Sequence, residues 1–321
     1  MGHDVVVIGG SAGALDPIKE IVAELPPDTP AAVVIVVHMA ATAKSALAPI
    51  LNRLGGMQAV TPCDGDALKP GYVYIPTPDR HLELQDGTIR LTRGPRVNGS
   101  RPAIDVLFRS AAASYGPRVA GVVLSGGMDD GSAGLAAIRA AGGVGIVQSP
   151  EDALMDSMPR NAIAVGSPEH VVPSGRIGEL LKKVVNSDGS SGEKSREKGE
   201  IEMEVVGVND TPGEVTGITC PDCHGSIWLQ NGDGGQVAFT CRTGHSYSPE
   251  SFFELQAGNV ENALWAGVRS LEEQSSLAAA MASRSNRMQD AQGAERFEKR
   301  RRAADRNAEV LRKLLLDRSD A

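Results

Sequence analysis

Three residue types that serine hydrolases combine occur after strand-like segments in the N-terminal half of the sequence. Ser11 lies in the small-residue turn of VIGGSAGAL, His38 follows the apolar run AAVVIVV, and Asp129 and Asp130 follow VAGVVLSGGM. A serine hydroxyl is a poor nucleophile until a histidine takes its proton, and a carboxylate fixes the tautomer of that histidine. These residues therefore indicate a nucleophile, a base and an orienting acid.

The turn that holds Ser11 has two competing interpretations, a nucleotide-binding loop and a nucleophile turn. A dinucleotide fingerprint needs glycine at the first, third and sixth positions, but from Gly9 the third is Ser11 and the sixth is Ala14. His38 also stands where that fold requires an acidic residue for the ribose. The small residues around Ser11 match a strand-to-helix nucleophile turn, in which helix N–H groups can act as oxyanion donors. A helix-capping serine is the structural alternative.

Alternating strand-like and helix-like segments over residues 4–187 must position these side chains. The runs DVVVIG, AAVVIVV, VAGVVLS and GVGIVQ are typical of buried strands, and helix-like segments begin near Ala43 and Ser132. The alternation predicts an α/β fold with a doubly wound, mostly parallel sheet and flanking helices. In such a sheet, ligands bind at the carboxyl ends of adjacent strands, so we expect Ser11, His38 and the acidic pair to lie together there.

Composition excludes several classes of protein. The 321 residues are 41% hydrophobic and carry a formal net charge of −8, which argues against a nucleic-acid partner. No apolar run reaches membrane-spanning length, and the N-terminus lacks the layout of a signal peptide. The four cysteines are too few and too unevenly placed for a disulfide framework. We therefore expect a cytoplasmic protein without membrane insertion or nucleic-acid binding.

Shifts in composition divide the chain into domains. Residues 1–187 are expected to form the α/β catalytic domain, and the polar, Gly/Ser-rich stretch 188–213 a flexible linker. Residues 214–250 are expected to form a small zinc-ribbon-like module. Residues 251–321 are rich in Ala, Leu, Glu and Arg and predict a helical hairpin broken near residues 290–293. The apolar positions of this helical tail suit packing on itself, self-association or the binding of an adaptor.

A second constellation, in the C-terminal part, has the spacing of a metal site. Cys220 and Cys223 form C-x2-C, and Cys241 and His245 form C-x3-H beyond a hairpin-like segment with an NGDGG turn. With four protein ligands and no open position, the ion would be a structural Zn²⁺ that allows so small a segment to fold. His224 is a rival ligand inside the first knuckle. A redox pair of cysteines is the other interpretation, but it would need a βαβ context that the sequence lacks.

A set of segments carries a family resemblance and occurs in order within residues 4–185: IGGSAGAL, VVHMAATAKSALAPILNRL, DGDALKPGYVYIPTPDRHLEL, RPAIDVLF, LSGGMDDGSAGL and DSMPRNAIAVG. Together they resemble successive segments of the CheB chemoreceptor protein-glutamate methylesterases. The resemblance implies that Ser11 is the nucleophile, His38 the general base and Asp130 the orienting carboxylate. It also implies hydrolysis of glutamyl methyl esters on methylated chemoreceptor helices, with release of methanol, and deamidation of glutamines in some members. We expect no cofactor for catalysis.

The sequence also departs from the family pattern. The run Ser125-Gly126-Gly127-Met128 replaces the usual Thr-Gly-Met-Gly, which displaces the methionine whose main chain helps to form the oxyanion pocket. Ala12 and Met128 are expected near the oxyanion and Arg101 near the substrate. The receiver domain of the family is not recognisable ahead of the first strand, so we expect regulation by other means. The alternative function is a catalytically silent scaffold or adaptor in a chemosensory-like signalling complex.

Overall fold

The computed structural model describes residues 3–42, 46–186, 213–231 and 237–317. The chain forms two compact units, Met1–Phe252 and Phe253–Ala321. The expected linker, residues 188–213, lies outside the described residues except for Gly213. Across the part of the chain that the structure describes, no helix combines the length and the apolar character needed to cross a membrane.

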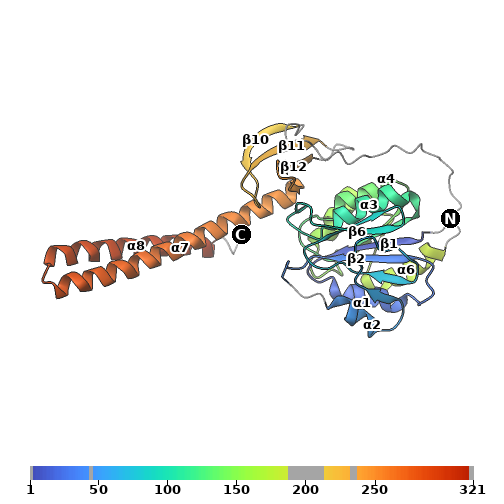
Figure 1. The fold of residues 1–321 in the computed structure, drawn as a ribbon, viewed down its shortest axis with the longest axis horizontal. Coiled ribbons are helices and arrows are strands. Elements are labelled where there is room, and N and C mark those ends of the chain that lie inside the picture. The colour runs from blue at the N-terminus through green and yellow to red at the C-terminus, as the bar shows by residue number, and fades with distance from the viewer. Residues whose placement is uncertain (1–2, 43–45, 187–212, 232–236, 318–321) are drawn as a thin grey trace. The chain divides into compact units, whose positions relative to one another are not determined.

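The first unit is built around a seven-stranded sheet in which all neighbouring strands are parallel. Its strands are β1 (Val5–Gly10), β2 (Ala32–Val37), β3 (Gln58–Val60), β4 (Tyr72–Tyr74), β7 (Val119–Val123), β8 (Val144–Gln148) and β9 (His170–Val172). Their order in the sheet is β3-β4-β2-β1-β7-β8-β9. Figure 1 shows β1 and β2 side by side in this unit. The central strands are runs of Val, Ile and small residues, as expected for strands that are covered on both faces.

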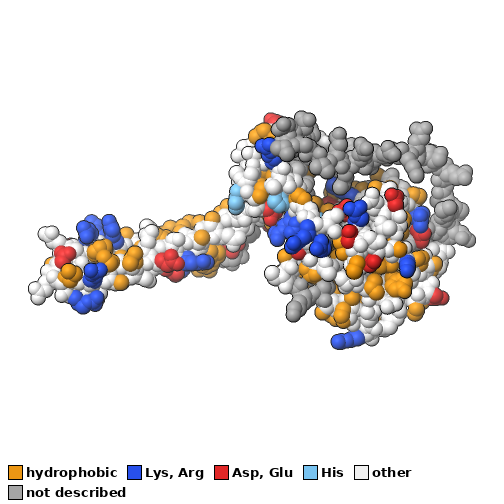
Figure 2. All heavy atoms as spheres, viewed as in Figure 1, with side chains coloured by type: hydrophobic (Ala, Val, Ile, Leu, Met, Phe, Trp, Pro, Cys, Tyr) orange, Lys and Arg blue, Asp and Glu red, His pale blue; other side chains and the backbone are white. Residues whose placement is uncertain are grey.

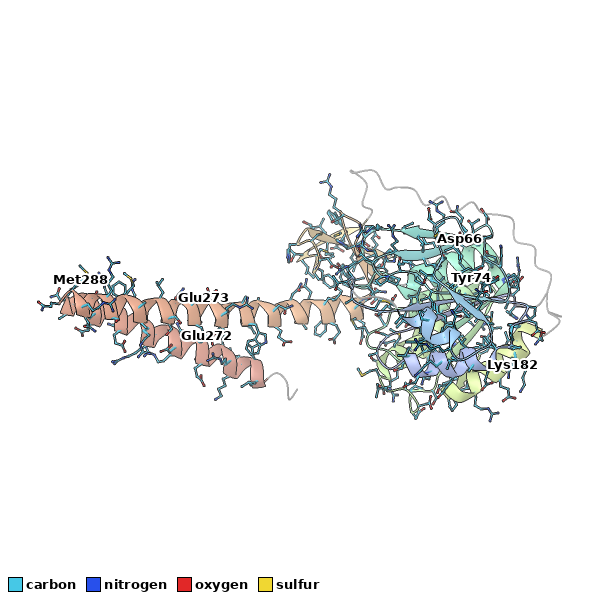
Figure 3. The ribbon with its side chains drawn as sticks, turned by 60° about the horizontal axis from the view of Figure 1, so that its bottom comes forward. Asp66, Tyr74, Lys182, Glu272, Glu273 and Met288 are labelled. Atoms are coloured by element: carbon cyan, nitrogen blue, oxygen red, sulfur yellow. The ribbon has the colours of Figure 1, made fainter. Side chains whose placement is uncertain are left out.

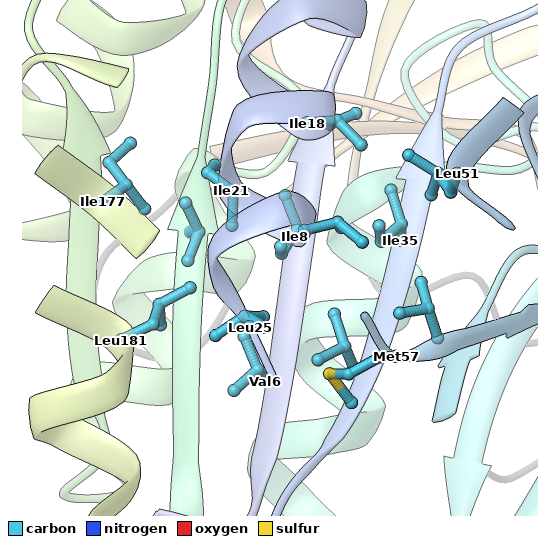
Figure 4. Close-up of a cluster of buried hydrophobic side chains, with 14 of the residues drawn as sticks. Val6, Ile8, Ile18, Ile21, Leu25, Ile35, Leu51, Met57, Ile177 and Leu181 are labelled. Atoms are coloured by element: carbon cyan, nitrogen blue, oxygen red, sulfur yellow. The ribbon is translucent and has the colours of Figure 1, made fainter. Parts of the chain in front are cut away.

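Two layers of helices cover the two faces of this sheet. The helices are α1 (Leu15–Glu24), α2 (Leu47–Asn52), α3 (Ile104–Tyr115), α4 (Ser132–Ala140), α5 (Ser157–Gly166) and α6 (Ser174–Asn186). Val6 and Ile8 of β1 pack against α1, α2 and α6, whereas Val5 and Val7 face the layer that contains α3, α4 and α5. Figure 4 shows Ile8 among the labelled side chains of α1 and of strand β2. The predicted doubly wound α/β fold is confirmed.

The middle of the first unit differs in detail from the predicted alternation. Strands β5 (His81–Gln85) and β6 (Thr88–Thr92) form a separate antiparallel hairpin that packs on α3 instead of joining the large sheet. Helix α2 begins at Leu47 instead of near Ala43, and residues 43–45 lie outside the described residues. Of the strands β4, β5 and β6, only β4 pairs with the parallel sheet.

A small antiparallel sheet forms the C-terminal part of the first unit. Its strands are β10 (Glu214–Thr219), β11 (Ser226–Asn231), β12 (Val237–Cys241) and β13 (Ser246–Tyr247), hydrogen-bonded in that order. β11 and β12 pair from Ile227 opposite Cys241 to Asn231 opposite Val237. The predicted NGDGG turn between them, residues 232–236, lies outside the described residues.

The second unit contains most of helix α7 (Pro249–Arg287) and all of α8 (Ala291–Asp317). The two helices run side by side and are joined by a hydrogen bond from Ser275 to Asp305 (2.5 Å) and by an ion pair between Arg312 and Glu272. Figure 3 shows Met288 at the tip where the helices connect. Asp290 accepts the backbone N–H of Gly293 (2.9 Å) and so caps the start of α8. The break lies at residues 288–290, next to the predicted position.

Candidate active site

Ser11 and His38 stand at the same edge of the sheet, each directly after the last residue of its strand. Gly10 of β1 lies opposite Val37 of β2 in the parallel register. The N–H of His38 donates to the Gly10 carbonyl (3.1 Å), so the pairing extends one residue beyond the strands. The N–H of Ser11 donates to the carbonyl of Ser125 (2.9 Å), which follows β7 on the other side of β1. Three strand ends therefore converge at Ser11, as the sequence predicts.

The turn from β1 into α1 is shaped by its small residues. A Cβ added to Gly10 would lie 2.5 Å from Cβ of Ala14, and Gly13 has a φ of +83° that favours glycine. Ala14 occupies the N-cap position of α1, and no side chain caps that end of the helix. The helix-capping interpretation of Ser11 is therefore wrong. Among the described residues the Ser11 hydroxyl has no hydrogen-bond partner, which leaves it available for chemistry.

His38 and Asp130 form a close and largely buried pair. Nε2 of His38 lies 2.7 Å from Oδ2 of Asp130, and the two side chains are 12% and 2% exposed. Oδ2 also accepts the N–H of Ile104 (2.7 Å), while Oδ1 accepts Nδ2 of Asn98 (3.0 Å) and the N–H of Asp105 (3.1 Å). Burial by itself raises the pKa of Asp130, but the hydrogen bond and charge of His38, with the Ile104 and Asn98 donors, hold that pKa below its ordinary value.

An ionised Asp130 fixes the tautomer of His38. Because a carboxylate can only accept hydrogen bonds, Nε2 of His38 must carry the proton that lies between the two side chains. Nδ1 is then the unprotonated nitrogen of the neutral ring and can take a proton from a hydroxyl. The sequence predicts this pairing of residues, and the structure brings His38 and Asp130 into hydrogen-bond distance at the strand edge that also holds Ser11.

A second buried carboxylate lies beside the first. Oδ1 of Asp105 accepts the N–H groups of Gly131 (3.0 Å) and Gly134 (2.6 Å) at the start of α4, and Oδ2 accepts Nδ2 of Asn98 (3.2 Å). Burial, followed by the nearby charge of Asp130, raises the pKa of Asp105 to about 7. Asn98 thus bridges the two acids. Its position before a glycine is typical of an ordinary turn, and no feature of the sequence indicates this role.

The loop after β7 lies against Ser11. A Cβ added to Gly126 would come within 3.0 Å of Cβ of Ser11, so the loop passes directly beside the serine. Met128, two residues further along, has a φ of +60° and accepts a hydrogen bond from Asn161 at its carbonyl (3.2 Å). The carbonyl of Ala12 accepts the hydroxyl of Ser125 (2.8 Å), which ties the Ser11 turn to this loop. The structure therefore places Ala12 and Met128 in the two segments that flank Ser11.

Arg101 is held by other residues. Its guanidinium donates to Oδ1 of Asp79 through Nε (2.9 Å) and Nη2 (2.6 Å), and to the Gly94 carbonyl through Nη1 (2.6 Å). Hydrogen bonds from Arg93 and Arg101 lower the pKa of Asp79 to about 2, so the ion pair persists over the ordinary pH range. The role of Arg101 in contacting substrate stays a prediction, and the visible role of its side chain is to join two loops.

The four residues predicted as metal ligands come together in the small sheet. The donor atoms of Cys220, Cys223, Cys241 and His245 all lie within 4.8 Å of one another, and His224 is not part of this group. Sγ of Cys223 and Sγ of Cys241 are 3.6 Å apart, and Nδ1 of His245 lies 3.4 Å from Cys241 Sγ. An ion about 2.3 Å from two sulfurs at a tetrahedral angle separates them by about 3.8 Å. The donor set and its spacing therefore fit a tetrahedral metal ion.

Comparisons with known proteins identify relatives of the N-terminal part. Residues 6–181 match the family model described as CheB methylesterase. The protein named "Protein-glutamate methylesterase/protein-glutamine glutaminase 1" of Xanthomonas euvesicatoria pv. vesicatoria is 38% identical over 181 residues, which are 55% of this chain and 50% of that protein. A relative from Leptospira interrogans is 37% identical over 182 residues, 56% of this chain and 94% of the relative.

A solved structure is similar over the same part. The crystal structure of the Thermotoga maritima CheB methylesterase catalytic domain superposes with a TM-score of 0.55 and 32% sequence identity, over 58% of this chain and 100% of that one. The match spans only about half the length of the Xanthomonas relative. The small antiparallel sheet and the two long helices begin at residues 214 and 249, beyond the segment that matches the family model.

Proposed function

Because the chain belongs to the CheB methylesterase family, we propose that it is a serine carboxylesterase that hydrolyses glutamyl methyl esters on chemoreceptor-like proteins. The observation that carries the proposal is the buried contact of 2.7 Å between Nε2 of His38 and Oδ2 of Asp130, at the strand edge that also presents Ser11. The helices of such receptors that carry these esters lie in the cytoplasm, so the proposed place of action is cytoplasmic.

In the proposed reaction an acyl-enzyme forms on Ser11 and is then hydrolysed, and His38 transfers the protons in both stages. Nδ1 of His38 takes the hydroxyl proton of Ser11 as Oγ attacks the ester carbonyl, and then gives that proton to the departing methoxide, which leaves as methanol. Water then attacks the acyl-enzyme as His38 takes its proton, and His38 returns that proton to Oγ of Ser11 as the acyl bond breaks, which leaves glutamate and free Ser11. A glutamine side chain would follow the same path with ammonia as the leaving group, which is the proposed deamidation.

The oxyanion of each tetrahedral intermediate needs hydrogen-bond donors beside Ser11. Ala12 is exposed directly after the nucleophile, and Met128 lies in the loop that touches Ser11. Within the part of the chain that the structure describes, neither backbone N–H has a hydrogen-bond partner. We assign these two N–H groups to the oxyanion, because fixed and unused backbone donors stabilise such a charge without reorganisation.

Methanol release from a methylated chemoreceptor fragment tests the proposed function. Wild type should release methanol, and Ser11→Ala should lower kcat by at least about 10³ because no nucleophile remains. Ser276→Ala, an exposed serine of α7, is the matched control and should retain the wild-type rate. Absence of release by wild type and control, in protein with intact secondary structure, would refute the esterase and favour the silent scaffold.

We further propose that Cys220, Cys223, Cys241 and His245 hold a structural Zn²⁺. The donors fill all four positions of a tetrahedron, so the ion would have no open position for substrate. When bound, it would supply cross-links that a four-stranded sheet with a small core lacks. Elemental analysis of the purified chain should give about one zinc per chain, and Cys223→Ser should reduce that content. Zinc absent from wild type purified without chelators would refute the site.

The helical tail is proposed as a surface for self-association or for an adaptor. Apolar side chains are interspersed with charged ones along the two helices (Figure 2), and several are well exposed, including Val260, Trp265, Leu277, Val310 and Leu314. Analytical ultracentrifugation of the full chain checks self-association. A monomer at all concentrations, together with no loss of activity in Leu277→Glu, would leave this part of the proposal without support.

A further inference from the structure

A short segment connects the cluster of Cys220, Cys223, Cys241 and His245 to the active site. This segment, the strap, comprises Ser246–Ser251 and begins directly after His245. The N–H of Asn98 donates to the carbonyl of Ser246 (2.8 Å), and the N–H of Ser246 donates to the Arg96 carbonyl (3.3 Å). The strap therefore runs beside the chain segment that carries Asn98, within the first compact unit.

The strap fixes the orientation of the Asn98 amide. The backbone N–H of Ser248 donates to Oδ1 of Asn98 (2.9 Å). Because a backbone N–H can only donate, the oxygen of the amide must face the strap and Nδ2 must face the two acids. From there Nδ2 reaches Asp130 at 3.0 Å and Asp105 at 3.2 Å. Asn98 is 3% exposed, so water is a poor substitute for the Ser248 donor.

The strap also holds the residue next to the catalytic acid. Oδ1 of Asp129 accepts the hydroxyls of Ser248 (2.7 Å) and Ser251 (2.6 Å). Ser251 is fully buried, and the N–H of Ser251 donates to the Ser248 hydroxyl (3.1 Å) at the start of α7. The main chain at Asp130 is therefore anchored on one side by Asp129, while its carboxylate is anchored by Asn98. Both anchors depend on the strap.

The position of the strap depends on the cluster. The hydroxyl of Tyr247, which is 1% exposed, donates to Oδ2 of Asp222 (2.7 Å) inside the first cysteine knuckle and lies 3.1 Å from Sγ of Cys220. Gly244, next to His245, packs so closely on Pro95 that an added Cβ would lie 2.9 Å from its ring. If the knuckles open, these contacts are lost and the strap has no fixed base.

We propose that the strap is a positioning element of the active site, and that a metal ion in the four-ligand cluster holds it there. Asn98, Ser248 and Ser251 are its positioning residues, because they touch the catalytic acid or its neighbour and not the substrate. This inference rests on the proposed esterase function for its kinetic consequence. Its structural consequence, that metal binding orders the loop around residues 96–106, is independent of any substrate.

Hydrogen exchange of the full chain tests the structural consequence. Removal of the metal with a chelator should speed exchange in peptides that cover residues 96–106, because the N–H groups of Asn98, Ile104 and Asp105 lose fixed acceptors. Added Zn²⁺ should restore slow exchange. Peptides from α6 serve as the internal control for global folding. Unchanged exchange over residues 96–106 in the metal-free chain would overturn the proposal, whether or not the protein is an esterase.

Kinetics of strap variants test the second consequence. Ser251→Ala should lower kcat about tenfold, with KM for the methyl ester changed less than about twofold, because the strap acts on the acid and not on the substrate. Ser248→Thr keeps the hydroxyl and should stay near wild type, whereas Ser248→Ala should resemble Ser251→Ala. Ser226→Ala, an exposed serine of the same small sheet, is the control. A full wild-type kcat in both alanine variants would overturn the positioning role.

Discussion

Replacement of Asp130 by asparagine is the sharpest test of the catalytic assignment. Both oxygens of the carboxylate accept hydrogen bonds, Oδ2 from His38 and Ile104 and Oδ1 from Asn98 and Asp105. An asparagine has one acceptor oxygen and one NH2 group that only donates. In either orientation the new NH2 group faces hydrogen-bond donors, either His38 and Ile104 or Asn98 and Asp105.

The expected loss follows from the tautomer of His38. If the new NH2 faces the ring, Nε2 must become the acceptor and Nδ1 must carry the proton, so His38 can no longer take a proton from Ser11. We expect kcat to fall about 10⁴-fold, which corresponds to about 5.5 kcal/mol of transition-state stabilisation. Either orientation also leaves a buried N–H without an acceptor, which lowers the free energy of unfolding by about 1–3 kcal/mol.

The assay is methanol release from a methylated chemoreceptor fragment, with kcat and KM determined separately and the fold checked by circular dichroism. Asp16→Asn, on the exposed face of α1, is the matched control. Asp129→Asn should lose less than about tenfold, because an amide oxygen can still accept the two strap hydroxyls. The reasoning fails if Asp130→Asn keeps kcat within tenfold of wild type, or if Asp129→Asn loses more than Asp130→Asn.

Three further outcomes are expected. Gly13→Ala should lower the free energy of unfolding by about 2 kcal/mol in urea titrations, because φ is +83° and the new Cβ would lie 2.6 Å from neighbouring side-chain atoms. Gly126→Ala should lower kcat about tenfold or more, because its Cβ would press on Cβ of Ser11 at 3.0 Å. Burial and the charge of Asp130 raise the pKa of Asp105 to about 7. Between about pH 4 and about pH 7 the folded chain therefore keeps a proton on Asp105 that the unfolded chain has lost. The free energy of unfolding should fall as pH rises from about 4 to about 7.

Each of these three has a matched comparison. Gly127→Ala meets nothing within 4 Å and its stability should stay within about 0.5 kcal/mol of wild type, so equal losses at Gly13 and Gly127 would contradict the steric argument. A wild-type kcat in Gly126→Ala would show that the loop yields without moving Ser11. For the pH dependence, Asp105→Asn should have a flatter profile than wild type, and parallel profiles would exclude Asp105 as the source.

The parts of the fold that depend on local pattern could be predicted from the sequence. Runs such as AAVVIVV carry β-branched apolar side chains on both faces of a strand, which is typical of a parallel sheet covered by helices on both sides, so the parallel strands and their shared edge could be predicted. That edge is sufficient to bring Ser11 and His38 onto neighbouring strand ends. Residue types and strand pattern alone left Asp129 and Asp130 open, and the choice of Asp130 came from the family resemblance. In the structure Asp130 meets His38, whereas Asp129 accepts the hydroxyls of Ser248 and Ser251.

The parts that depend on distant contacts could not be predicted. Asn98 and Ser248 are separated by 150 residues, and no periodicity or spacing relates an asparagine in a turn to a backbone N–H between β13 and α7. The same limit applies to Asp105, which opens α3 but accepts the N–H groups at the start of α4. Its sequence context is that of an ordinary acidic residue in the first turn of a helix.

The contact between the Asp130 carboxylate and the start of α3 predicts which residues would be retained in related sequences that have lost activity. The Asp130 carboxylate accepts the N–H groups of Ile104 and Asp105, so the side chain that we propose as the orienting acid also caps the N-terminus of α3. A related sequence without the proposed esterase activity would still be selected to keep this aspartate, because its loss would destabilise the fold. The hydroxyl of Ser11 has no such structural role, because it makes no hydrogen bond among the described residues. Among divergent sequences, retention of the residue equivalent to Ser11 should therefore indicate activity better than retention of the residue equivalent to Asp130.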